Sequence, residues 1–95
     1  MQFEWDEAKR EANLLNHRLD FLDARTIWSL PVLDPCAQRR VGAEHRMTAL
    51  GVVGEDEMVI AVVYPVRDDV VRLISARRAR RNERQLYQDR IGRGR

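Results

Sequence analysis

Six side chains along this sequence have the chemistry needed to cleave a phosphodiester bond. They are Lys9, His17, Glu44, Arg46, Arg72 and Arg77. Attack of a ribose 2′-hydroxyl on the adjacent phosphate requires a base for that hydroxyl and an acid for the departing 5′-oxygen. It also requires cations that stabilise the developing negative charge. His17, Glu44 and Lys9 are candidates for the base and the acid. The three arginines of this set, together with Arg67, are candidates for charge stabilisation. The residue types are therefore compatible with RNA cleavage that needs no metal ion.

Each of these residues also has a purely structural interpretation. His17 falls near the end of a predicted helix, where it would interact favourably with the last carbonyl groups. Glu44 and Arg46 are two residues apart on a predicted strand and would form a surface ion pair. Arg72 lies in an apolar strand, where an internal salt bridge would satisfy it. On a regular strand Arg72 and Arg77 would face opposite ways, unless Arg77 already belongs to the following helix.

Charge is strongly segregated along the chain. Residues 77–95 hold eight arginines and two acidic residues, a net charge of +6, whereas residues 1–76 hold nine basic and thirteen acidic residues. Such segregation is typical of proteins that meet a polyanion or an acidic partner, although a solvated basic helix would look the same. Five arginines are candidates for contact with an RNA backbone, because the guanidinium group binds phosphate in a bidentate manner. They are Arg67, Arg78, Arg80, Arg81 and Arg84.

Several classes of site and of protein do not fit the sequence. His17 and His45 are far apart and have no cysteine partners, and the glycines are scattered, so we expect no metal and no cofactor. Cys36 is the single cysteine and is interpreted as a bystander, which suits a reducing cytoplasm. No apolar run approaches the ~20 residues that span a bilayer, and the charged N-terminus does not resemble a signal peptide. We therefore expect a cytoplasmic protein that is not embedded in a membrane.

The first third of the chain predicts one strand and two helices. Alternation at residues 3–5 indicates a short strand, and Asp6 is a suitable N-cap for an amphipathic helix over residues 7–16. Lys9, Asn13 and His17 recur every four residues and are predicted to lie on a polar face of this helix. Asp20 is expected to cap a second helix, which Pro31 ends.

The remainder predicts a loop, three strands and a long helix. Residues 30–41 contain two prolines and no periodicity, which indicates a loop. Strands are expected over residues 43–53, 58–64 and 70–76, with turns at 54–57 and 65–69, and a final helix over 78–91. The order β-α-α-β-β-β-α predicts an α+β fold, an antiparallel sheet packed with helices. We expect a single domain over residues 1–91, followed by a disordered basic tail at 92–95.

Three motifs in this order resemble the BrnT family of bacterial toxins. The first is Phe3-x-Trp5-Asp6-x-x-Lys9-x-x-x-Asn13-x-x-x-His17-x-Leu19-x-Phe21. The second is Glu44-x-Arg46 followed by Leu50-Gly51. The third is Val62-Val63-Tyr64-x-x-Arg67, then Val71-Arg72-Leu73-Ile74-Ser75-Ala76-Arg77-Arg78-Ala79, with Glu83-Arg84 and Tyr87 beyond. Together they cover residues 3 to 87.

This resemblance implies a RelE-like α+β fold and a ribonuclease that arrests growth by cutting RNA. It also implies a cognate antitoxin of the BrnA type, with a ribbon-helix-helix DNA-binding domain, that neutralises the toxin by binding it. Contact with operator DNA would then pass through the antitoxin complex. The resemblance carries over Lys9, His17, Glu44, Arg46, Arg67, Arg72 and Arg77 as functional positions, without distinguishing the base from the acid.

Two other functions remain open from the sequence alone. A non-catalytic basic module would bind an acidic protein or a nucleic acid and would need neither base nor acid. An inactive relative would keep the fold and the antitoxin contact without cleaving RNA.

Overall fold

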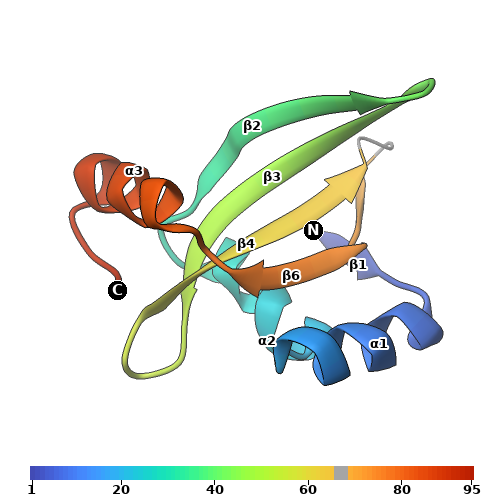
Figure 1. Ribbon diagram of the computed structural model, residues 1–95, viewed down its shortest axis with the longest axis horizontal. Coiled ribbons are helices and arrows are strands. Elements are labelled where there is room, and N and C mark those ends of the chain that lie inside the picture. Colours follow the sequence, from blue (N-terminus) through green and yellow to red (C-terminus); the bar gives the residue numbers. More distant parts are fainter. Residues whose placement is uncertain (66–68) are drawn as a thin grey trace.

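The computed structural model describes residues 1–65 and 69–95, which form a mixed α+β fold (Figure 1). Arg67, predicted to contact RNA, lies outside the described residues. In chain order the elements are β1 (Gln2–Glu4), α1 (Glu7–His17), α2 (Phe21–Ala24), the 3₁₀ helix η1 (Arg25–Ser29), β2 (Leu33–Val41), β3 (Glu44–Val53), β4 (Met58–Pro65), β5 (Val70–Arg72), β6 (Ser75–Arg78) and α3 (Arg81–Ile91).

The main sheet has four antiparallel strands in the order β2-β3-β4-β6. This confirms the predicted fold class. A separate parallel pair joins β1 to β5, with Phe3 opposite Val71. The structure thus has two more strands than the predicted order: β2 is additional, and the predicted strand over 70–76 is divided into β5 and β6.

Residues 33–41 form a strand where the sequence predicted a loop. The ladder to β3 is regular from Ala37 onward, and its register is interrupted between Leu33 and Ala37. Pro35 lies in this interruption, where a residue without an N–H group does not break the ladder. The prolines therefore hid the strand pattern without preventing the strand.

The two predicted N-caps are confirmed. Asp6 accepts a hydrogen bond from the Ala8 amide at 2.8 Å, and Asp20 accepts one from the Leu22 amide at 2.9 Å. Arg10 on α1 also donates to Asp20 at 2.8 Å, so the cap of α2 is tied to the preceding helix. The final helix begins at Arg81, three residues later than predicted, because residues 75–78 pair with β4 instead.

The helices cover the two faces of the sheet unequally. On one face, α2 and η1 pack on β3, β4 and β6 in a core made of Leu19, Phe21, Ala24, Ile27, Ala49, Val53, Ile60, Val62, Leu73 and Ala76. Gly51 allows the close approach of η1, since a Cβ atom there would lie 2.4 Å from the Cβ of Ile27. On the other face, Tyr87 of α3 packs on Leu50, Val52, Val59 and Ala61. Helix α3 lies at one end of this face, and the β2–β3 ribbon extends well beyond it (Figure 1).

Helix α1 is fastened to the outer edge of β6 by Asn13. The Asn13 amide nitrogen donates to the carbonyl oxygens of Leu19 and Ala76, each at 2.9 Å, and its side-chain oxygen accepts from the Ala76 amide at 3.0 Å. Asn13 is the one buried polar side chain among the described residues. Its three hydrogen bonds fix α1 beside the strand that bears Ser75 and Arg77.

Residues 92–95, predicted to be a disordered tail, follow α3 and run beside the start of β4. The Arg95 amide donates to the Glu57 carbonyl at 2.8 Å, and the Val59 amide donates to the Arg95 carbonyl at 2.7 Å. Arg93 also pairs with the Glu57 carboxylate. None of the helices in the described parts of the chain has the length and apolar character needed to cross a membrane.

Replacing Asn13 with alanine removes the three hydrogen bonds that its side chain makes to Leu19 and Ala76. We expect the free energy of unfolding to fall by about 1–3 kcal/mol, the usual effect of leaving buried polar groups unpaired. Urea denaturation of the parent and the variant measures this change. Asn16→Ala, an exposed position on the same helix, is the matched control and should change stability by at most about 0.5 kcal/mol. Equal losses in both variants would contradict the role given to Asn13.

Candidate functional site

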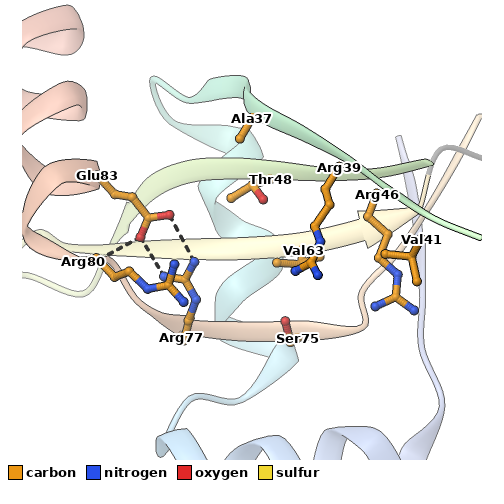
Figure 2. A pocket seen from close by; sticks show the side chains of 10 residues that line it. All are labelled: Ala37, Arg39, Val41, Arg46, Thr48, Val63, Ser75, Arg77, Arg80 and Glu83. Carbon is orange, nitrogen blue, oxygen red and sulfur yellow. Dashed lines mark hydrogen bonds and ion pairs between the residues drawn. The ribbon is translucent and has the colours of Figure 1, made fainter. Parts of the chain in front are cut away.

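A cavity of about 380 Å³ lies on the part of the sheet that α3 leaves uncovered (Figure 2). We call it the arginine cavity. It is lined by Ala37, Arg39, Val41, Arg46, Thr48, Val63, Ser75, Arg77, Arg80 and Glu83. These residues come from β2, β3, β4, β6 and the start of α3, so the cavity exists only in the folded sheet.

Strand pairing brings the polar side chains of the arginine cavity to one face. Arg46 and Thr48 are two residues apart on β3 and therefore lie on the same face of the sheet. Arg39 of β2 is the direct cross-strand partner of Arg46. Two like charges directly opposite each other destabilise a sheet. Glu44 lies beside this pair, with its Oε2 atom 3.4 Å from Arg46 Nε. The lining itself nevertheless contains four arginines and a single carboxylate, that of Glu83.

Arg77 is held in the cavity wall by Glu83. Its Nη1 and Nη2 atoms donate to the two carboxylate oxygens of Glu83 at 2.7 and 3.1 Å, and the Arg80 amide donates to Glu83 at 2.8 Å (Figure 2). Burial raises the pKa of Glu83, but the hydrogen bonds from Arg77 and Arg80 and their positive charges outweigh burial and lower it overall. Glu83 is therefore an ionised anchor for the Arg77 guanidinium and also caps the first turn of α3.

A second cavity, of about 250 Å³, lies between α1 and β6. We call it the α1 cavity, and it is lined by Lys9, Ala12, Asn13, Asn16, His17, Ile74 and Ser75. Lys9 and His17 line it together because they recur on one face of α1, as their spacing predicted. Ser75 lines both cavities, so they adjoin each other across strand β6.

The structure gathers four of the six predicted catalytic side chains around these two cavities. Arg46 and Arg77 line the arginine cavity, and Lys9 and His17 line the α1 cavity. Glu44 reaches the site through its contact with Arg46 and lines neither cavity. Arg72 lines neither cavity either: it is on β5, where its Nη1 atom lies 3.3 Å from Glu4 on the paired strand β1.

The arginines predicted to contact RNA are placed unequally. Arg80 lines the arginine cavity. Arg78 and Arg81 are exposed, and alternation along β6 directs Arg78 to the opposite side from Arg77. Arg84 is half-buried, and its guanidinium donates to the Ala79 carbonyl at 2.7 Å.

Four polar residues of the arginine cavity were not among the predicted functional residues: Arg39, Thr48, Ser75 and Glu83. Arg39 fell in the segment read as a loop, so its pairing with Arg46 was hidden. Thr48 shares the alternation of Glu44 and Arg46, a signal already present in the sequence. Glu83 was counted as a charge within the basic segment and as part of the third motif, without a functional role. Its contact with Arg77 forms because the chain turns between β6 and α3.

Nothing within residues 1–65 and 69–95 brings three His, Cys, Asp or Glu side chains together in a group that could hold a metal ion. The polar groups of the two cavities are instead positively charged or uncharged, apart from Glu83. This arrangement can bind an anion and surround it with hydrogen-bond donors.

Comparisons with known proteins agree on one family. Residues 5–83 match the family model of the ribonuclease toxin BrnT of type II toxin–antitoxin systems. The chain is also similar to the 1.1 Å crystal structure of the Brucella abortus ribonuclease toxin BrnT. The two are 32% identical, the match covers 85% of this chain and 99% of that chain, and the TM-score is 0.59. No curated protein matches the sequence. Every residue that lines the two cavities falls within the segment matched by the family model.

The Glu83 anchor should make stability depend on pH. A carboxyl group whose pKa is lower in the folded state stabilises the fold above its unfolded pKa, about 4.3 for glutamate, and loses this effect as the pH falls through its folded pKa. We expect Glu83→Gln to be less stable than the parent at pH 7, with the difference narrowing below about pH 4. Urea denaturation at a series of pH values tests this. The exposed Glu11→Gln is the control, and a parent–Glu83→Gln difference that is constant with pH would contradict the prediction.

Proposed function

The chain belongs to the BrnT family of ribonuclease toxins of type II toxin–antitoxin systems, and we propose that it is an endoribonuclease whose arginine cavity binds the phosphate at which RNA is cut. We propose further that the reaction is attack of a ribose 2′-hydroxyl on that phosphate, without a metal ion. A base removes the proton of the 2′-hydroxyl as its oxygen bonds to phosphorus, the bond to the 5′-oxygen breaks, and an acid gives a proton to the departing oxygen.

The observation that carries this proposal is the excess of positive charge in the arginine cavity. Arg39 of β2 and Arg46 of β3 lie directly opposite each other on adjacent strands, so their positive charges repel. An anion bound between them would remove this repulsion. Arg77 is held at a fixed place in the same cavity by Glu83. Preorganised guanidinium groups are suited to the charge that develops on phosphorus in the transition state, because they need no rearrangement as that charge appears.

The proton transfers are assigned to the side chains around Ser75. His17 and Lys9 lie just across β6 from the arginine cavity and are proposed to act on the 2′-hydroxyl and the departing oxygen. Glu44, beside Arg46, is an alternative base. Arg72 is proposed to hold β5 to β1 through Glu4 rather than to contact RNA. The exposed Arg78 and Arg81 would meet neighbouring phosphates, and RNA binding should then weaken steeply with salt.

The family also implies a protein antitoxin. We propose a BrnA-like ribbon-helix-helix antitoxin that binds this chain and blocks cleavage, with operator DNA contacted only through the complex. The toxin would act in the cytoplasm on cellular RNA, and its production without the antitoxin would arrest growth.

Removing one cavity arginine should slow cleavage without unfolding the chain. We expect Arg46→Gln to lower the rate of RNA cleavage about 10²-fold, the usual effect of losing one donor to a transition-state anion. Purified protein and RNA in EDTA give this rate directly. Arg90→Gln, on the exposed last turn of α3, is the matched control and should cleave at the parental rate. Intact RNA with the parent at saturating protein would instead favour a non-catalytic binding module.

His17 should affect the chemical step more than RNA binding. We expect His17→Ala to lower the single-turnover cleavage rate by about 10²–10⁴-fold, as is typical for a lost acid or base, while the affinity for RNA changes little. Affinity is measured on RNA with 2′-deoxy substitutions that prevent cleavage. A parental single-turnover rate in His17→Ala would exclude this residue from proton transfer.

A further inference from the structure

We propose that the α1 cavity is a nucleobase subsite, which takes the base of the nucleotide next to the phosphate in the arginine cavity, and that Asn16 reads the edge of this base. The inference rests on the proposed ribonuclease function and adds sequence preference to it. Asn16, Ala12 and Ile74 then determine which RNA sequence is cut rather than whether it is cut.

The arginine cavity and the α1 cavity meet at Ser75 of β6. Ser75 lines both, and β6 is an outer strand of the sheet, so nothing else from the sheet separates them on that side. An RNA strand with a phosphate in the arginine cavity (Figure 2) can therefore cross β6 at Ser75 and place its neighbouring base against α1.

The two cavities differ in charge and in polarity. The arginine cavity has four guanidinium groups, which suit a phosphate. The α1 cavity has one ammonium group, Lys9, and its lining includes the apolar side chains of Ala12 and Ile74. A nucleobase has an apolar face and a polar edge, and proteins recognise unpaired bases by contact with the face and hydrogen bonds to the edge. The α1 cavity offers a surface of each kind.

The two asparagines of the α1 cavity differ in whether their side-chain amides are already hydrogen-bonded. The amide of Asn13 is fully engaged with Leu19 and Ala76, so it forms a rigid wall and has no donor left for a ligand. Asn16 lies one helical turn further on and is exposed. Within the part of the chain that the structure describes, no hydrogen bond is made by the Asn16 side chain, and its amide offers both a donor and an acceptor. An asparagine amide held in one orientation makes two hydrogen bonds to a base whose donor and acceptor are placed to match it, as adenine N6 and N7 are.

The test is cleavage of an RNA pool with randomised sequence, followed by sequencing of the cut ends. We expect the parent to prefer one base at a single position beside the cut. Asn16→Ala should reduce that preference about tenfold, within the range expected for one bidentate contact. Asn16→Asp replaces the donor with an acceptor and should change the preferred base.

A second variant tests occupancy of the cavity itself. Ala12→Trp fills the α1 cavity from an exposed position, and we expect it to raise KM for RNA at least tenfold. Glu11→Trp places the same side chain on the adjacent exposed residue, which does not line the cavity, and should leave KM unchanged. Melting curves of both variants, compared with that of the parent, are needed to check that each is folded.

The outcomes separate this inference from the proposed function. An unchanged preference in both Asn16 variants, or an unchanged KM in Ala12→Trp, overturns the subsite while Arg46→Gln still reports on the arginine cavity. Cleavage by the parent with no base preference also overturns it. Cleavage by Arg46→Gln at the full rate overturns the placement of the phosphate and, with it, the subsite that adjoins that phosphate. A parent that does not cut RNA overturns both.

Discussion

The contact between Asn13 and the backbone of Ala76 is the constraint on which the site depends. Strand β6 is one of the two outer strands of the sheet, and its outward amide and carbonyl groups would be unpaired without a partner. One asparagine side chain supplies a donor and an acceptor to the same residue, as a further strand would. Its amide nitrogen also donates to the carbonyl of Leu19, which lies in the segment that connects α1 to α2. These bonds hold α1, and with it Lys9 and His17, beside β6.

The second constraint is electrostatic. The cavity places Arg39 opposite Arg46 and holds Arg77 close by, a grouping that a purely structural sheet would avoid. Two carboxylates limit the repulsion: Glu44 lies beside Arg46, and Glu83 forms a bidentate pair with Arg77. They do not neutralise the cavity. Unfavourable groupings of like charge are found mainly at functional sites, where a loss of folding stability accompanies the ability to bind a ligand. The charge of this cavity suits an anionic ligand, which agrees with the RNA substrate that the family implies.

Local signals in the sequence predicted much of this fold. Asp6 and Asp20 were recognisable as caps because a short acidic side chain precedes each apolar helical pattern, and β3 and β4 were recognisable from alternation and from a continuous apolar run. The strand β2 was missed because Pro35 interrupts its pattern, and Arg39 was missed with it. Asn13 was read as part of a polar helix face, since its spacing relative to Lys9 and His17 says nothing about the strand that packs there. The pairing of Arg77 with Glu83, and of Arg72 with Glu4, depends on tertiary contacts that periodicity alone does not reveal.

The central claim is that cleavage occurs at a phosphate in the arginine cavity by attack of the neighbouring 2′-hydroxyl. The most direct measurement is the chemistry of the product ends in EDTA, compared for an RNA oligonucleotide and the same oligonucleotide with a single 2′-deoxy nucleotide at the cut. The account predicts 5′-hydroxyl ends, together with 2′,3′-cyclic or 3′-phosphate ends, and no cut at the deoxy position. Products with 5′-phosphate and 3′-hydroxyl ends, or cleavage that persists at the deoxy nucleotide, would contradict it, because water would then be the nucleophile.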